Sequence, residues 1–390
     1  MFYSRVWIES LVQLDRFTAT LHGADKRWDS SRKMPYSVPG RWVRDLDLSG
    51  LDCRHVGLDV DELLTKLFPL LPFMTAFVLN TTMTLSRRAL AALSTRDGCQ
   101  HLKALKGIKA PITYPTNQSR FPAPVVDSDP LVQLIRNSVH LEELEIHGPG
   151  FDSLETDLAS LEVNLASLGV DCVSQSANVP PPVQVDMEGE ESGLKLNSLT
   201  SLSILSTHAS PLMLTLLLSE LPSLQHLVVT PYDDLPYPAS LVSKFIQTHG
   251  STLRSLHLYT PKDTWPTVSH PSPSDILLTC PNLTHLSLES PLPELKIPPP
   301  NHLGNVHPLQ TLSVPRPSRR CYQTVSTVVS SLQNLRVVRT RDVRWLQRGI
   351  ASQSMETGTQ GEMREWKRRF ALRGVDLLDA EMNRDDDDCT

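Results

Sequence analysis

The chain has 390 residues, with 37 Lys and Arg against 43 Asp and Glu, and a formal net charge of −6. This balance argues against a dedicated nucleic-acid-binding protein, whose binding domain is usually strongly basic. The hydrophobic content of 40% argues against a chain that is disordered throughout. The longest apolar stretches, near residues 73–79 and 212–218, are far shorter than the roughly 18 residues of a membrane helix.

The N-terminal segment, residues 1–40, is predicted to form a helical cap. Charged residues such as Arg5 and Glu9 interrupt its apolar part, so it is not a secretory signal peptide. No two cysteines form a CxxC pair, which argues against a zinc ribbon or a thioredoxin-type site. Scattered thiols without a secretion signal favour a reducing compartment, and we expect a cytoplasmic or nuclear protein.

A short pattern, L-x-x-L-x-L with conservative replacements, recurs through residues 41–345 about ten times. Seven of the nine intervals between its central positions fall between 25 and 31 residues. Leucine-rich repeats have a period of about 20–29 residues, each with a strand followed by a helix or 3₁₀ turn. The central positions are 46, 77, 105, 144, 202, 227, 256, 286, 312 and 338.

The segments between these patterns have the apolar spacing of short amphipathic helices. A single strand–helix unit cannot bury its apolar face, whereas stacked units share a continuous core. The sequence therefore predicts an α/β fold, a leucine-rich-repeat solenoid with a curved parallel β-sheet on the concave side and helices on the convex side. The predicted helices are Asp61–Leu70, Ser86–Ser94, Leu131–Val139, Pro211–Leu221, Ser240–Thr248, Asp275–Thr279 and Tyr322–Leu332.

Two segments depart from the repeat pattern. Residues 174–192 are rich in Pro, Ser, Glu and Gly, and we expect a disordered acidic insertion there. Residues 346–390 are predicted to form a basic helix followed by a disordered acidic tail. This terminal helix is either a solvated helix or a contact for a partner or nucleic acid.

Alternate residues of a strand point to opposite faces. If the leucine positions face the helices, the residues between them line the concave surface. This surface is acidic in the first strands, rich in Ser and His in the middle and basic at the end, which suits the selection of a protein partner. The predicted partner-binding residues are Asp45, Asp47, Lys106, Glu143, Glu145, His147, His226, His257, Tyr259, His285, Glu289, Arg339 and Arg341.

The sequence offers little for catalysis. It lacks GxGxxG, GxxxxGK[ST], HExxH and GxSxG motifs. His226, His257 and His285 are expected on consecutive strands, in a row too loose to bring three ligands to one metal ion. Cys280 is expected to pack under the sheet as a small hydrophobic residue. We therefore expect no enzymatic activity, no catalytic residues, no cofactor and no metal.

The repeats resemble those of fungal F-box proteins with leucine-rich repeats. The segment Cys280–Leu288 (CPNLTHLSL) is similar to their cysteine-containing repeat. Residues Tyr3–Phe17, the strand Trp42–Leu48 and the segment Glu365–Val375 also resemble the corresponding segments of such proteins. The helical F-box itself, about 45 residues with an apolar Leu-Pro opening, is not in this sequence.

The resemblance implies a non-enzymatic protein-interaction module, the substrate-recognition part of an F-box-type receptor of an SCF (cullin–RING) ubiquitin ligase. Its partners would be a protein substrate on the concave face and, if an F-box lies upstream, the linker subunit of the ligase. No membrane partner is expected, and nucleic acid is disfavoured by the net charge. Two alternatives remain open: a free-standing repeat scaffold without a ubiquitin role, and an enzyme with an unrecognised site at the three histidines.

Overall fold

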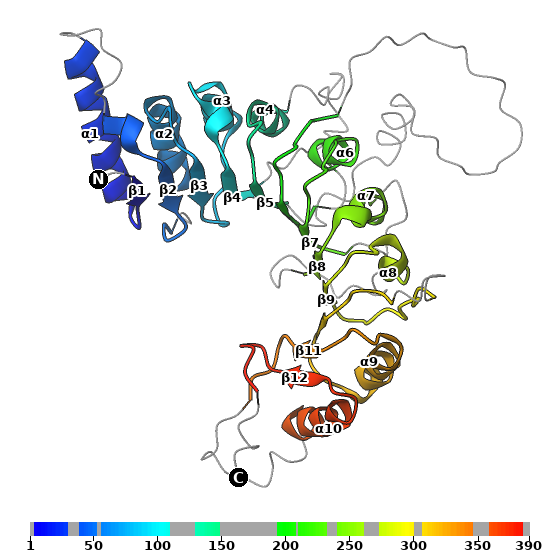
Figure 1. Cartoon of the computed structure of the whole chain (residues 1–390). Helices are drawn as coiled ribbons and strands as arrows, with labels where there is room; N and C mark the ends of the chain where they lie inside the picture. Colours follow the sequence, from blue (N-terminus) through cyan, green and yellow to red (C-terminus); the bar gives the residue numbers. More distant parts are fainter. Residues whose placement is uncertain are drawn as a thin grey trace, which may run out of the picture.

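In the part of the chain that the structure describes, twelve strands form one parallel sheet in which each strand pairs with its neighbours along the sequence (Figure 1). The computed structural model describes residues 4–29, 39–52, 56–109, 129–148, 193–207, 210–231, 240–260, 273–299, 306–345 and 359–384. The predicted insertion at 174–192 and the acidic tail lie outside these residues. The strands are β1 (Arg5–Trp7), β2 (Asp45–Leu48), β3 (Ala76–Leu79), β4 (Ala104–Lys109), β5 (Glu143–His147), β6 (Ser201–Leu205), β7 (His226–Val229), β8 (Ser255–Leu258), β9 (His285–Ser287), β10 (Thr311–Val314), β11 (Val337–Thr340) and β12 (Asp376–Leu378).

Helices alternate with these strands and lie on the outer side of the arc that Figure 1 shows. The α-helices are α1 (Leu11–Asp29), α2 (Gly57–Leu67), α3 (Arg87–Thr95), α4 (Pro130–Asn137), α6 (Pro211–Leu217), α7 (Val242–His249), α8 (Ile276–Thr279), α9 (Arg319–Ser331) and α10 (Thr359–Ala371). Short 3₁₀ turns are η1 (Pro39–Trp42), η2 (Phe68–Leu70), η3 (Cys99–His101) and η6 (Gly250–Thr252).

Capping side chains fix where several helices begin. Ser86 accepts a hydrogen bond from the Ala89 N–H at 3.1 Å and is the N-cap of α3, one residue before Arg87. The Ser210 hydroxyl plays the same part for α6, accepting from the Met213 N–H at 3.0 Å. Each cap satisfies one of the backbone donors that a helix leaves unpaired at its first turn.

The central leucine positions of the repeats align across the sheet. Leu46 pairs in register with Phe77, and Leu227 pairs with Leu256. These side chains are fully buried against the helices and belong to one hydrophobic core that runs from Ile8 to Leu377.

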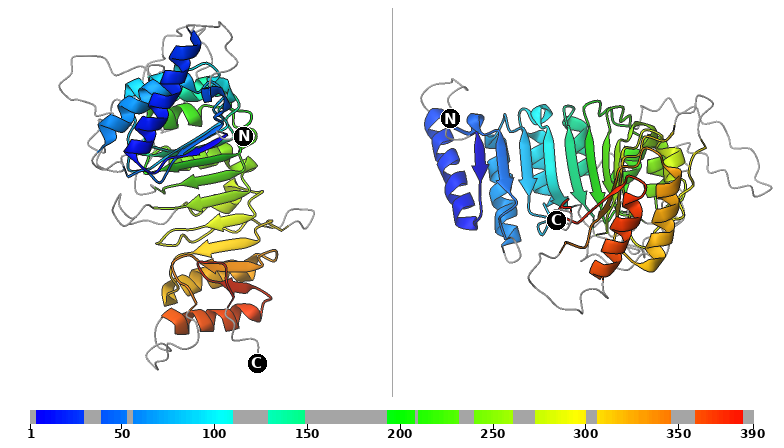
Figure 2. Two further views of the ribbon diagram at one scale, coloured as in Figure 1. Left: turned by 90° about the vertical axis from the view of Figure 1, so that its left-hand side faces the viewer. Right: turned by 60° about the horizontal axis from the view of Figure 1, so that its bottom comes forward.

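The sheet curves because its two layers need different room. Parallel strands lie about 4.8 Å apart, whereas a helix with its side chains is about 10 Å wide. The helix layer is therefore longer than the strand layer, and the stack bends toward the strands. In Figure 2 the strands follow one another like the rungs of a ladder. The predicted fold, an α/β solenoid with the sheet on the concave side, is confirmed.

The C-terminal helix α10 is packed against the solenoid. Its Trp366 and Phe370 are buried, and their rings lie 5.6 Å and 6.0 Å from that of Tyr322 on α9. Strand β12 then pairs with β11 and continues the sheet. The basic helix predicted here is present, and its inner side closes the C-terminal end of the core.

Candidate functional site

Side chains that alternate with the buried leucines form two rows on the concave face. The first row contains, in strand order, Arg5, Asp45, Ala76, Ala104, Glu143, Ser201, His226, Ser255, His285, Thr311 and Val337. The second row contains Trp7, Asp47, Val78, Lys106, Glu145, Ser203, Val228, His257, Ser287, Ser313 and Arg339. The thirteen residues predicted for this face lie in these rows or at the next alternate position, and none of them is fully buried.

Ion pairs between neighbouring strands hold the acidic side chains of the N-terminal half. Arg5 Nε lies 2.9 Å from a carboxylate oxygen of Asp45, and Lys106 pairs with Glu143. Both pairs are partly exposed to solvent, so each contributes at most about 1 kcal/mol to stability. Their side chains remain accessible to a partner.

Glu145 and His147 form a pair on strand β5. The His147 Nε2 lies 2.9 Å from the Glu145 Oε1, and this hydrogen bond lowers the pKa of the Glu145 carboxyl, against the opposing effect of burial. Glu145 is therefore ionised at neutral pH, and it contributes negative charge to the concave face.

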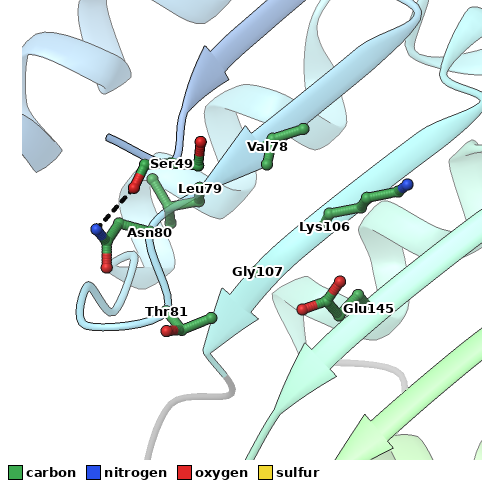
Figure 3. Close-up of a pocket in the computed structure, with 8 residues that line it drawn as sticks. All are labelled: Ser49, Val78, Leu79, Asn80, Thr81, Lys106, Gly107 and Glu145. Carbon is green, nitrogen blue, oxygen red and sulfur yellow. Dashed lines mark hydrogen bonds between the residues drawn. The ribbon is translucent and has the colours of Figure 1, made fainter. Parts of the chain in front are cut away.

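A shallow pocket of about 310 Å³ opens where β3, β4 and β5 end (Figure 3). Lys106 and Glu145 lie on one side of it, and the turn with Asn80 and Thr81 lies on the other. The Asn80 side-chain amide donates to the Ser49 carbonyl at 2.8 Å, which fixes this turn against the preceding repeat. The lining residues are Ser49, Val78, Leu79, Asn80, Thr81, Lys106, Gly107 and Glu145.

A bulge in β4 shapes the floor of this pocket. The register between β4 and β5 shifts between Leu105 and Ile108, so two residues of β4 lie opposite one residue of β5. Gly107 occupies the bulge with φ +71°, and a Cβ there would lie 2.0 Å from the Leu79 carbonyl oxygen. Only glycine fits this position.

Two histidines are in direct contact in the C-terminal half. The rings of His257 and His285 lie 4.4 Å apart at 80°. His285 also lies 3.1 Å from the Ser313 hydroxyl and 3.5 Å from that of Ser255. Burial, and then the nearby His285 and Arg341, lower the pKa of His257 to about 4, and burial lowers the pKa of His285. Both rings are neutral at pH 7 and act as polar surface rather than as charge.

The three predicted histidines are not in one row. His226 and His285 share the first row with Ser255 between them, whereas His257 is in the second. Within the described ranges, no group of three His, Cys, Asp or Glu side chains could hold a metal ion. Cys280 is fully buried, and burial raises the pKa of its thiol to about 12, so it packs as a small apolar residue, as expected.

The Arg341 side chain makes its polar contacts with other residues of the solenoid. Its guanidinium donates to the Leu258 carbonyl at 2.9 Å and to the Ser287 hydroxyl at 3.2 Å, and it pairs with Glu289 at 2.9 Å. The Arg341 side chain is only 16% exposed and that of Glu289 only 20%. Arg339 likewise donates to the Ala380 carbonyl. The basic end of the face is therefore partly neutralised by the chain itself.

The structure adds a functional candidate that the repeat pattern did not predict. Strand β1 pairs with β2 and places Trp7 beside Asp47, with 67% of the tryptophan exposed. The alternation of Val6 and Ile8, which are partly and fully buried, with exposed Arg5 and Trp7 was the available signal. Strand β1 does not match the L-x-x-L-x-L pattern, so the repeat analysis did not predict Trp7 as a residue of the concave face.

Comparisons with known proteins give no family for this chain. No family profile matches the sequence, and no curated protein matches it. Among solved structures, a crystal structure of a Bacteroides fragilis protein from the Northeast Structural Genomics Consortium has 10% sequence identity and a TM-score of 0.32, covering 93% of this chain and 73% of that one. None of the helices in the described part of the chain is long and apolar enough to cross a membrane.

Proposed function

We propose that this protein is a non-enzymatic protein-interaction module that binds a partner protein on its concave face. The observation that carries this proposal is the pair of rows of mostly polar side chains, which are held in register on one twelve-stranded sheet. Such a surface is rigid, so little conformational entropy is lost when a partner binds it. Curved repeat sheets offer the large extended area that protein partners need.

The polar cluster around His285 supports binding rather than nucleophilic catalysis. The two hydroxyls near its ring belong to Ser255 and Ser313, and both serines are buried. A serine nucleophile must reach a substrate carbonyl, whereas these two side chains are covered by their neighbours on the concave face. The resemblance of the repeats to those of F-box proteins leads us to propose further that the module is the substrate-recognition part of an SCF-type ubiquitin ligase receptor, in the cytoplasm or nucleus.

The test is affinity purification of the protein tagged at its C-terminus, followed by mass spectrometry, with two matched tryptophan variants. Ser203→Trp places a bulky side chain in the second row at the centre of the sheet, whereas Gln247→Trp places it on the exposed side of α7. We expect Ser203→Trp to lose the captured partners and Gln247→Trp to keep them. Equal capture by both variants would reject the concave face as the binding surface.

The same experiment separates the ligase from the scaffold. A cullin and its F-box-binding linker among the captured proteins would support the ubiquitin-ligase role. Stable capture of other proteins without any ligase subunit would instead support a free-standing repeat scaffold.

A further inference from the structure

Trp7 is a large aromatic side chain that is exposed on the concave face. It is 67% exposed, and it stands at the start of the second row beside Asp47. The Trp7 Nε1 and the Glu9 Cγ each lie 3.4 Å from the position that a Cβ on Gly50 would occupy. The indole therefore lies beside the backbone of Gly50 and near the acidic side chain of Glu9. Tryptophan is usually well buried in a folded chain, and it is among the residues that contribute most to protein–protein binding.

The charges around Trp7 favour a cationic occupant. The concave rows of β1 to β5 contain the carboxylates of Asp45, Asp47, Glu143 and Glu145 and the cations of Arg5 and Lys106. Each of these two cations already pairs with one of the carboxylates. Asp47 accepts a hydrogen bond from the Ser49 N–H and makes no ion pair with any residue that the structure describes. A net negative charge therefore remains beside the indole.

The pocket at the bulge continues the same row. Val78 follows Asp47 in the register, and Lys106 follows Val78. With about 4.8 Å between strands, the pocket wall at Val78 lies roughly 10 Å from the Trp7 position along the row. An extended peptide advances about 3.4 Å per residue, so about three residues connect the two places.

We propose that the N-terminal half of the concave face binds an extended basic segment of the partner protein. A Lys or Arg of this segment stacks on the Trp7 indole, next to Asp47, in a cation–π contact. An apolar side chain about three residues away enters the pocket beside Val78, and a second basic residue faces Glu145. This proposal rests on the proposed function and names the chemistry of the partner.

The probe is a fluorescein-labelled nine-residue serine peptide with a central leucine and a lysine three residues away on each side, with a copy that has glutamate in place of both lysines. Fluorescence anisotropy measures their binding to the full-length protein. We expect the lysine peptide to bind more tightly than the glutamate copy. We expect Trp7→Ala to weaken its binding about fivefold, because an exposed cation–π contact is lost.

Trp42→Ala is the matched control, because Trp42 is also exposed, at 58%, but lies in η1 outside the sheet. This variant should bind the lysine peptide as the wild type does. Wild-type affinity in Trp7→Ala, an equal loss in Trp42→Ala, or equal binding of the two peptides would overturn the proposal.

The two proposals can fail separately. If Ser203→Trp abolishes capture of the partner while Trp7→Ala binds partner and lysine peptide like the wild type, the concave face is the binding surface but the basic-segment assignment is wrong. If Ser203→Trp and Gln247→Trp capture equally, the protein-binding role of the concave face fails. In that case, loss of peptide binding in Trp7→Ala would still locate a cation site.

Discussion

Arg341 connects its own strand end to β8 and β9 through a single guanidinium. The planar fork can donate to a carbonyl, a hydroxyl and a carboxylate at once, which a lysine ammonium on a flexible stem does with less geometric definition. The contacts with Leu258 and Glu289 lie on the concave surface and are shielded from solvent. They act as a strap that spans four successive repeats, from β8 to β11, and holds them at one curvature.

Removing this strap should destabilise the C-terminal half. Arg341→Met keeps the apolar stem but leaves the half-buried Glu289 carboxylate without its cation, so we expect a loss of about 1–3 kcal/mol in the free energy of unfolding. Arg344→Met is the control, since its ion pair with Glu381 is largely exposed and should contribute less than about 0.5 kcal/mol. Chemical denaturation of both variants measures the difference, and equal losses would show that the strap has no special role.

The contact of His257 and His285 predicts a pH dependence of stability. The folded pKa of His257, about 4, lies below the ordinary value of 6.5, so the unfolded chain binds a proton more readily. Stability therefore falls as the pH drops from about 6.5 toward 4, by at most about 3 kcal/mol for this group. His285, Arg339, Arg341 and His226 all oppose protonation here.

His257→Asn should flatten this dependence. The measurement is the denaturation midpoint of wild type and variant at pH 7 and pH 4.5. The wild type should lose more stability than the variant between these two values. A parallel loss in both proteins would assign the effect to other groups, such as the buried His249 and His307, whose pKa values burial also lowers.

Pair contacts of this kind are the part of the site that the sequence could not predict. The alternation rule placed Arg341 and Glu289 on the concave face, but they are 52 positions apart in the chain, and no local pattern links them. Which side chains remain available to a partner depends on such pairs, so exposure could not be inferred from the alternation alone.

At the scale of the element, the bulge of β4 depends on one glycine. Gly107→Ala introduces a side chain at φ +71° and within 2.0 Å of the Leu79 carbonyl oxygen, so the two strands must separate locally. We expect a loss of more than about 2 kcal/mol, the sum of left-handed backbone strain and the clash. Thermal unfolding followed by circular dichroism measures it.

Gly374→Ala is the control for backbone strain alone. Gly374 has φ +69°, but a Cβ there meets nothing within 4 Å. Its substitution should cost about 1 kcal/mol. If Gly107→Ala costs no more than this, the close approach of β3 and β4 at the bulge is not rigid.

Most elements could be predicted because the repeat imposes the same period on strand and helix. The helix expected at Ser86–Ser94 is α3 at Arg87–Thr95, and the central leucines fall in register. The terminal strands β1 and β12 were not predicted. Each has three residues and lacks the L-x-x-L-x-L pattern, so each is recognisable only through the neighbouring strand that it pairs with.

For the whole molecule, the assignment of the two sheet faces is open to a direct test. Leu256 is fully buried in the middle of the array, so Leu256→Asp buries a carboxylate without a partner and should cost more than about 3 kcal/mol. His226→Asp, at an exposed position of the preceding strand β7, should change stability by less than about 1 kcal/mol. Equal melting curves for the two variants would reverse the face assignment.

The order of the strands also has a consequence for biosynthesis. Because each strand pairs with its chain neighbours, a growing polypeptide can add one repeat after another without waiting for a distant segment, and contacts of short sequence separation form quickly. The Arg341 bond to the Leu258 carbonyl spans 83 positions and is an exception. This hydrogen bond can form only after β9, β10 and β11 have emerged from the ribosome. The curvature of the C-terminal half is therefore fixed late in translation.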